Sequence, residues 1–141
     1  MIKVLVSGSR NHLNEYGVVK YLEKWISEQK DNKFSMIHGD CPDRLVSKNL
    51  LMGRSVDMIA AETFKKYGKV QGFPADWSLG KPAGMIRNKK MVDMEPDVLL
   101  AFPFGASPGT RNCISLSKKA NIKTILVLEE KDLEVDPNLP F

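Results

Sequence analysis

The sequence predicts a three-layer, Rossmann-like α/β domain with a mostly parallel, five-stranded sheet. Strand-like and helix-like segments alternate as far as residue 128, and strands joined through helices pair in parallel. Residues 98–102 form a continuous apolar run, Val-Leu-Leu-Ala-Phe, which is typical of a central strand covered on both faces. The chain has 141 residues, of which 43% are hydrophobic, and this size and composition suit one globular domain.

Composition and periodicity place the elements in order. Apolar and β-branched residues predict strands at 2–6, 34–37, 70–73, 98–102 and 123–128. Apolar residues at helical spacing predict helices at about 15–30, 55–67, 82–95 and 109–120. Ser55 is expected to cap the second helix, Gly68 to end it, and Pro82 to lie in the first turn of the third.

Two segments have less regular patterns. Between residues 41 and 54, Leu45, Val46, Leu50 and Leu51 would suit a short helix. From Glu129 the chain carries acidic residues and two prolines without periodicity, so we expect this part to lie on the surface or project from it. The predicted organisation is therefore one domain at 1–128, followed by a C-terminal tail at 129–141.

Cysteine content and charge exclude several protein classes. Cys41 and Cys113 are far apart and have no CxxC spacing, which argues against a disulfide framework or a zinc site. The formal net charge of +4 favours anionic ligands, but no basic run or aromatic-interleaved basic stretch indicates nucleic acid. The N-terminus lacks a signal-peptide pattern and the apolar runs are strand-length, so we expect a cytoplasmic protein without a membrane segment.

The loops after the predicted strands are where chemistry should occur, because ligands of open parallel sheets bind beyond the carboxyl ends of the strands. After the first strand, Gly8 permits a tight turn, while Ser9 and Arg10 offer donors for a phosphate. After the second strand, His38 and Gly39 could contact a phosphate or a ribose. The alternatives are a plain strand-to-helix turn with a surface arginine, and a histidine that caps a strand end.

The loop after the third strand is the richest in residues that usually bind rather than pack. Trp77 either packs or stacks on a ring, Asp76 could hold sugar hydroxyls, and Gly84 keeps a helix start open to anions. The candidate ligand-binding residues of this region are Asp76, Trp77, Lys81, Gly84, Arg87 and Asn88. The alternative is a structural loop pinned by Trp77.

The fourth loop leads from the predicted central strand into the last helix. Gly109 and Thr110 at the start of that helix would form a phosphate-binding turn. The alternative is an ordinary helix start, with Thr110 packing or capping.

The motifs in these loops together resemble the YspA-type branch of the SLOG superfamily, whose members occur in bacteria and phages. The resemblance runs through residues 2–128 in order. It is carried by Val6-Ser7-Gly8-Ser9-Arg10, His38-Gly39, the helix start at Ser55–Ala60, Phe73-Pro74-Ala75-Asp76-Trp77, the block from Gly80 to Met91, Ala101-Phe102-Pro103 and Gly109-Thr110. It implies a Rossmann-like fold that binds, senses or processes nucleotides and their derivatives.

The superfamily also includes the lonely-guy phosphoribohydrolases, which cleave the N-glycosidic bond of cytokinin nucleotides. Their Arg-Lys-x-x-Met block is similar to Arg87 and Met91 here, and their Pro-Gly-Gly-x-Gly-Thr-x-x-Glu block is similar to Gly109 and Thr110. Cys113 stands where the catalytic glutamate would be. A neutral thiol cannot stabilise an oxocarbenium ion as a carboxylate does.

Two functions therefore remain open, and a third has weak support. The first is binding or sensing of a nucleotide-derived ligand. The second is hydrolysis of an N-glycosidic bond, with Arg87 and Asp76 as candidate catalytic residues and Asp57 as another possible carboxylate. Nucleic-acid binding would depend on net charge alone. No cofactor is indicated, although Mg²⁺ could accompany a phosphate, no metal site is expected, and self-association stays open for this fold.

Overall fold

The structure is a computed structural model, and it describes residues 1–43 and 53–138. Five strands alternate with helices along the chain, as the sequence predicts. The strands are β1 (Ile2–Gly8), β2 (Phe34–His38), β3 (Gly68–Gly72), β4 (Val98–Phe102) and β5 (Lys123–Leu126). The α-helices are α1 (Glu15–Glu28), α2 (Val56–Phe64), α3 (Ala83–Asp93), α4 (Pro108–Lys119) and α5 (Glu129–Asp132), and a 3₁₀ turn, η1, spans Trp77–Leu79.

All five strands pair in parallel, in the order β3-β2-β1-β4-β5. This confirms the predicted α/β class and shows that the sheet is wholly parallel. The chain first builds outward from β1 through β2 to β3, then crosses back to add β4 and β5 on the other side. The direction of winding therefore reverses between β1 and β4, so the loops that follow these two strands diverge.

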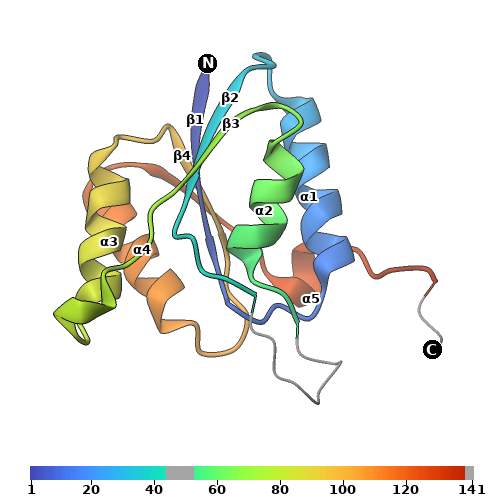
Figure 1. Cartoon of the computed structure of the whole chain (residues 1–141). Helices are drawn as coiled ribbons and strands as arrows, with labels where there is room; N and C mark the ends of the chain where they lie inside the picture. The colour runs from blue at the N-terminus through green and yellow to red at the C-terminus, as the bar shows by residue number, and fades with distance from the viewer. Residues whose placement is uncertain (44–52, 139–141) are drawn as a thin grey trace.

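Two helices cover each face of the sheet (Figure 1). On one face, α1 and α2 pack against side chains such as Val4 and Val6. On the other, α3 and α4 pack against residues that include Leu5 and Leu99. All five residues of β4 are buried, as expected for a central strand covered on both sides. Apolar residues that alternate along β1 thus supply both cores.

Local contacts explain where the observed helix ends differ from the predicted ones. Gly68 begins β3 instead of ending α2. A Cβ at this position would lie 1.9 Å from the carbonyl oxygen of Phe34 on the neighbouring strand, which explains the glycine. Ser55 is the N-cap residue of α2, but its hydroxyl donates to the carbonyl oxygen of Cys41 at 2.6 Å instead of capping the helix. α3 ends at Asp93, and Glu95 follows in the left-handed region with φ of 56°.

The C-terminal tail is partly integrated into the fold, which corrects the expectation of a purely superficial segment. α5 follows β5, and Leu133 joins the core on the α1 and α2 side of the sheet. Asn14 also donates its side-chain amide to the carbonyl oxygen of Glu134 at 3.0 Å. In Figure 1 the chain then leads away from the body of the domain, and Val135 is exposed.

The short helix considered for Leu45, Val46, Leu50 and Leu51 lies outside the described residues. The flanks of that segment are held by Arg54, which forms ion pairs with Asp43, Glu15 and Glu62. Arg54 and His12 also exchange two backbone hydrogen bonds of 2.9 and 3.0 Å. In the described part of the chain, no helix is both long and apolar enough to span a membrane.

Candidate functional site

A cleft of about 540 Å³ opens at the carboxyl edge of the sheet, where the loops after β1 and β4 separate. This is the place where open parallel sheets bind their ligands. The cleft is lined by residues 7–11, Gly39, Cys41, Asp57, Arg87, Asn88, Met91 and residues 104–110. The segments from the end of β1 and from the β4 loop into α4 therefore contribute most of the lining, and the loop after β2 completes it together with α2 and α3.

The first turn of α4 forms one wall of the cleft, and its backbone amides are available to a ligand. The N-cap residue Ser107 has φ of 41° and makes no side-chain cap, because its hydroxyl donates to the carbonyl oxygen of Phe104 at 2.6 Å. The first turn also contains no acidic residue. The N–H groups of Gly109 and Thr110 thus keep the positive end of the helix dipole open to an anion.

Ser9 lines the same cleft and carries a buried, unsatisfied hydroxyl. Only 6% of Ser9 is exposed, and its Oγ has no hydrogen-bond partner within the described residues. Its backbone is fixed between two elements, because its N–H donates to Phe102 at 3.3 Å and its carbonyl accepts from Val56 at 3.0 Å. A buried hydroxyl without a partner is costly, so a ligand that bonds to Ser9 would remove this penalty.

Arg10 supplies a positive charge at the cleft. Its guanidinium carbon lies 5.5 Å from the centre of the Trp77 ring. Within residues 1–43 and 53–138, Arg10 forms no ion pair and donates no side-chain hydrogen bond. Its N–H donors therefore remain free for a ligand.

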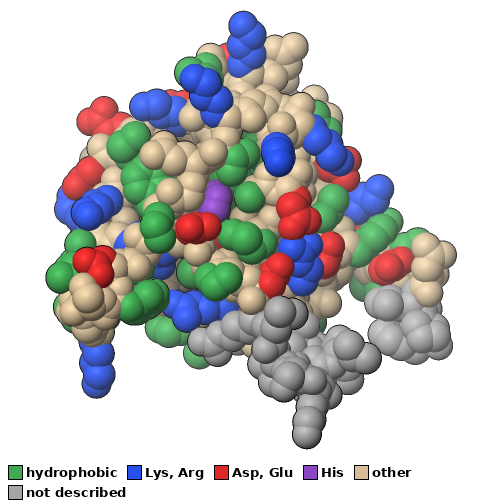
Figure 2. Space-filling model, in the orientation of Figure 1, with side chains coloured by type: hydrophobic (Ala, Val, Ile, Leu, Met, Phe, Trp, Pro, Cys, Tyr) green, Lys and Arg blue, Asp and Glu red, His purple; other side chains and the backbone are tan. Residues whose placement is uncertain are grey.

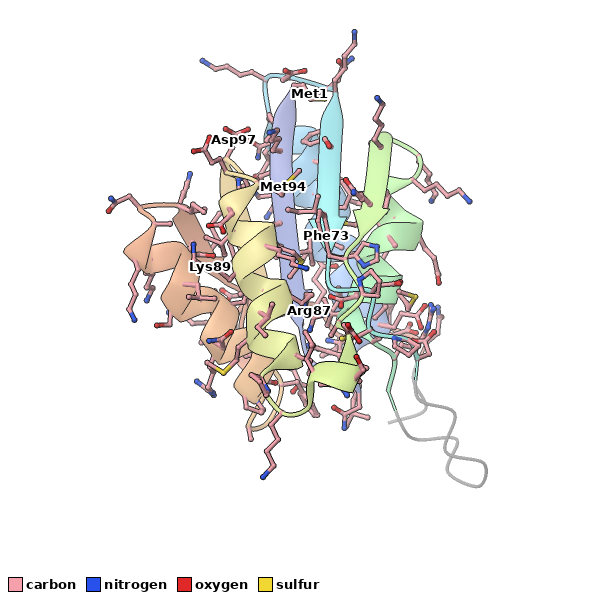
Figure 3. All side chains as sticks on the ribbon, turned by 60° about the vertical axis from the view of Figure 1, so that its left-hand side comes forward. Met1, Phe73, Arg87, Lys89, Met94 and Asp97 are labelled. Atoms are coloured by element: carbon pink, nitrogen blue, oxygen red, sulfur yellow. The ribbon has the colours of Figure 1, made fainter. Side chains whose placement is uncertain are left out.

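Arg87, in contrast, is a buried residue that joins several elements. Its Nη1 donates to the carbonyl oxygens of Gly39 and, at 3.4 Å, Phe73, while its Nε donates to Asn88 at 2.9 Å. Asn88 in turn donates to the carbonyl oxygen of Gly109 at 3.1 Å and to Asn112 at 2.9 Å. Figure 3 shows Arg87 in the half of α3 that is nearer the carboxyl edge of the sheet. These bonds fix the cleft floor while leaving Arg87 in its lining.

Asp57 is the one carboxylate that lines the cleft among the described residues. It lies in the first turn of α2 and is 4% exposed, and its Oδ2 accepts from the backbone N–H of Cys41 at 3.1 Å. Burial raises the pKa of this carboxyl, against the opposing effects of the Cys41 N–H and the charges on His38 and Arg87. Asp57 is thus poised to exchange a proton nearer neutral pH than an exposed aspartate.

Nine of the predicted ligand-binding residues line this cleft. They are Gly8, Ser9, Arg10, Gly39, Asp57, Arg87, Asn88, Gly109 and Thr110. Two of these glycines also allow close packing of neighbouring side chains. A Cβ on Gly8 would lie 2.5 Å from the Cβ of Val56, and one on Gly39 would lie 2.6 Å from Nη1 of Arg87. Gly109 differs, since a Cβ there would meet nothing within 4 Å.

Five other predicted residues, His38, Asp76, Trp77, Lys81 and Gly84, lie outside the cleft lining. His38 ends β2, and its Nδ1 accepts from the backbone N–H of Asp40 at 2.9 Å, as a strand-end cap would. Its burial lowers the pKa of the imidazole. Asp76 caps η1 by accepting from the N–H of Ser78 at 3.1 Å. Bonds from Ser78 lower the pKa of that carboxyl.

Several lining residues were not predicted from the sequence. Asn11 and Phe104 follow directly after the two central-strand turns, and Cys41 follows His38-Gly39. His12, next to the cleft, is fully buried, and its ring lies 5.3 Å from that of Phe104. Burial lowers the pKa of His12 to about 4. Their position in the sequence could have indicated them, because each of these residues continues a loop that the sequence already indicates as a candidate binding loop.

Cys113 does not take the place of a catalytic glutamate. It is fully buried among apolar residues such as Leu5 and Met91, and it does not line the cleft. Burial raises the pKa of its thiol to about 11, so the thiol is neutral at physiological pH. Within the described ranges, no group of three or more His, Cys, Asp or Glu side chains could hold a metal ion.

Comparison with known proteins gives one local similarity. No protein-family model matches the chain. A stretch of 52 residues is 52% identical to the Gene 61 protein of Mycobacterium phage D29. The match covers 36% of this chain and 42% of the phage protein, so the chain spans less than half of that relative. The sequence is therefore similar, over about a third of its length, to a phage protein.

Proposed function

We propose that the protein binds a nucleotide or a nucleotide-derived ligand in the cleft between the β1 and β4 loops. One observation carries this proposal: the buried, unpartnered hydroxyl of Ser9 shares the cleft with the uncapped first turn of α4. An anionic group at this position would accept hydrogen bonds from Ser9 and from the amides of Gly109 and Thr110. Arg10 would add the positive charge.

The distribution of charge supports a small anionic ligand over nucleic acid. Figure 2 shows Lys and Arg side chains interspersed with Asp and Glu on the face it presents, without a continuous basic stripe. The cleft volume of about 540 Å³ lies in the range of small-molecule sites. The resemblance of the loop motifs to the SLOG superfamily points to the same class of ligand.

A thermal-shift panel of nucleoside mono-, di- and triphosphates, NAD, ADP-ribose and cyclic nucleotides, with and without Mg²⁺, tests the proposal. A ligand at a hundred times its Kd adds roughly 2.7 kcal/mol. For a domain of this size that is a rise in Tm on the order of 10 °C. A panel in which no compound raises the Tm would overturn the proposal.

The Ser9→Ala variant makes the test specific to the cleft. Removing an unpartnered buried hydroxyl should raise the stability of the free protein, because a desolvation penalty disappears. The same change should weaken ligand binding, because a donor to the anion is lost. A variant that is more stable but binds less tightly would support the assigned role, whereas unchanged affinity would place the ligand elsewhere.

The rate at which Cys41 is alkylated independently tests whether the ligand occupies the cleft. Cys41 lines the cleft and is partly exposed, while Cys113 is fully buried. The burial of Cys41 and the nearby Asp57 raise the pKa of the Cys41 thiol, so labelling is best followed at alkaline pH. A ligand that occupies the cleft should slow the labelling of Cys41, and Cys41→Ser confirms which thiol reacts.

The second candidate is hydrolysis of the N-glycosidic bond of a bound nucleotide. It is favoured by Asp57, which brings a buried carboxyl to the cleft, whereas Asp76 caps an exposed turn outside it. In this reaction the bond between C1′ and the base breaks, water adds to C1′, and the base leaves with a proton. The ionised Asp57 would stabilise the oxocarbenium-like transition state.

Release of free base from nucleoside monophosphates, followed chromatographically, tests this second candidate. Asp57→Asn should abolish release while binding persists, and the matched variant Asp76→Asn should leave release unchanged. Equal activity in Asp57→Asn and wild type would remove Asp57 from the reaction. Binding without base release from any nucleotide would leave the first function alone.

A further inference from the structure

Trp77 is an exposed aromatic residue outside the cleft, yet it touches a residue that lines the cleft. It is 58% exposed, and its ring faces the guanidinium of Arg10 at 5.5 Å. Leaving so large an apolar ring in water is unfavourable. Neither the lining of the cleft nor the packing of the core accounts for its position.

Hydrogen bonds fix the backbone of the turn that carries Trp77, and the indole lies beside the start of α3. Asp76 accepts from the N–H of Ser78 at 3.1 Å, and the N–H of Gly80 donates to the carbonyl oxygen of Trp77 at 3.1 Å. On the α3 side, Cη2 of the indole lies 3.7 Å from the position of a Cβ on Gly84. The 3₁₀ turn thus fixes the backbone of Trp77 at a position from which the ring contacts Arg10.

Stacking on a ring uses the face of a guanidinium and leaves its edge free. The five N–H donors of arginine lie in the plane of the group, so an aromatic ring above that plane does not compete with an anion at the edge. Arg10 makes no other side-chain contact to a carboxylate in the described residues. The contact with the indole is thus the interaction that the structure shows for the Arg10 guanidinium.

We propose that Trp77 is a positioning residue, which holds Arg10 by a cation–π contact so that its donors face the anionic group of the bound ligand. This inference depends on the proposed function and deepens it, because it assigns the recognition of the anion to a pair of residues from two separate loops. Trp77 itself touches no ligand. Its contribution to binding comes entirely through Arg10.

A double-mutant cycle measures this dependence, with AMP and inorganic pyrophosphate as probes in isothermal titration calorimetry. Trp77→Ala should weaken binding of both probes by about two- to fivefold, the usual size of an exposed cation–π contact. Arg10→Ala should weaken binding by about tenfold or more, through loss of charged hydrogen bonds. In the Arg10→Ala background, Trp77→Ala should have no further effect.

Two further variants separate positioning from a general effect on the loop. Trp77→Phe keeps an aromatic face and should recover most of the lost affinity. Leu79→Ala removes another exposed apolar side chain from η1 and should leave affinity unchanged. If Trp77→Ala weakened binding equally with and without Arg10, the indole would act on the ligand directly or through the loop, and the inference would be wrong.

Fluorescence tests the contact without any ligand. The chain has two tryptophans, and Trp25 is buried in the core at 9% exposure, so acrylamide quenching reports mainly on Trp77. Arg10→Ala should increase quenching in the wild-type background and leave it unchanged in Trp77→Phe. An unchanged quenching constant would overturn the contact itself.

The outcomes distinguish this inference from the proposed function. Tight probe binding that is the same in wild type and Trp77→Ala would overturn the role of Trp77 and leave nucleotide binding intact. A protein that binds neither AMP nor pyrophosphate, and no nucleotide of the wider panel, would overturn both.

Discussion

The loops after the two central strands and the loop after β3 differ in a way that their sequences do not reveal. The loop after β3, residues 73–82, holds the densest group of motif residues, including Asp76 and Trp77, yet neither of these lines the cleft. The loops after β1 and β4 carry plainer sequences, such as Phe-Gly-Ala-Ser at 104–107, and they form most of its lining.

Strand order explains this difference. β1 and β4 are neighbours at the point where the winding of the chain reverses, while β3 is an edge strand. Loops diverge and leave a crevice only at the reversal point. A loop's place in the sheet therefore decides whether it lines a cleft. A loop that is rich in motif residues can lie outside the cleft, as the loop with Trp77 does, and still contact a lining residue such as Arg10.

The largest expected effect comes from Gly8→Ala in the first central loop. The added Cβ would lie 2.5–2.7 Å from three carbons of Val56, which is fully buried. Because Val56 cannot move away, we expect the free energy of unfolding to fall by about 3 kcal/mol. Urea denaturation measures this change. A loss below about 1 kcal/mol would show that α2 shifts readily away from β1.

The pH dependence of the free energy of unfolding should also depend on a residue of the first central loop, His12. The pKa of His12 is about 4 in the folded protein and near 6.5 when unfolded. Above pH 6.5 both states hold a neutral ring. As the pH falls from 6.5 to 4, only the unfolded chain gains the proton, so the free energy of unfolding should drop by about 3 kcal/mol.

Urea denaturation of wild type and His12→Asn between pH 7 and 4 isolates this contribution. The amide oxygen of asparagine can replace Nδ1, which accepts from the N–H of Asn14 at 3.1 Å. His38 and the carboxylates titrate in both proteins, so the difference in slope belongs to His12. Identical slopes would mean that water reaches the His12 ring in the folded state.

Substitutions in the two regions should also differ in their effect on ligand affinity, by a smaller free energy than the stability changes above. Arg10→Ala in the first central loop should weaken nucleotide binding by about tenfold or more, while Lys81→Ala after β3 should leave it nearly unchanged. Both variants remove one positive charge, so titration at two salt concentrations accounts for the general field. Equal losses would show that the β3 loop closes over the ligand after all.

The smallest effect is expected for Gly84→Ala at the start of α3. A new Cβ would meet Cη2 of Trp77 at 3.7 Å, an ordinary contact, and alanine favours the helix over glycine. We expect the free energy of unfolding to rise by about 0.5 kcal/mol, with ligand affinity unchanged. A marked loss of affinity would bring Gly84 and the adjoining loop after β3 into the binding site and would weaken the contrast between the two regions.

Local patterns were sufficient to predict the fold, and insufficient to predict the whole site. The alternation of strand-like and helix-like segments and the apolar run of β4 depend only on neighbours in the sequence, so the α/β class followed from them. Strand order is not encoded locally, and without it every loop after a strand was an equal candidate. Asp76 and Lys81 were therefore placed with Ser9, although they follow an edge strand.

Residue type alone also could not reveal tertiary contacts. Gly8 and Gly39 line the cleft as predicted, and they also make room for Val56 and Arg87, which lie 48 positions further along the chain in each case. The buried state of His12 and the proximity of Cys41 to Asp57 likewise depend on tertiary packing. The hydrophobic periodicity of the chain contains no signal for such contacts.

The ion pairs around Arg54 have a practical consequence for redesigning the protein. Nε and Nη2 of Arg54 both bond to Asp43, at 3.2 and 2.8 Å, and the second oxygen of Asp43 accepts from the N–H of Ser55 at 2.8 Å. These bonds tie Asp43 directly to Arg54 and Ser55. We expect this junction to accept a foreign peptide, such as an epitope or a reporter tag, beside the cleft without unfolding the domain.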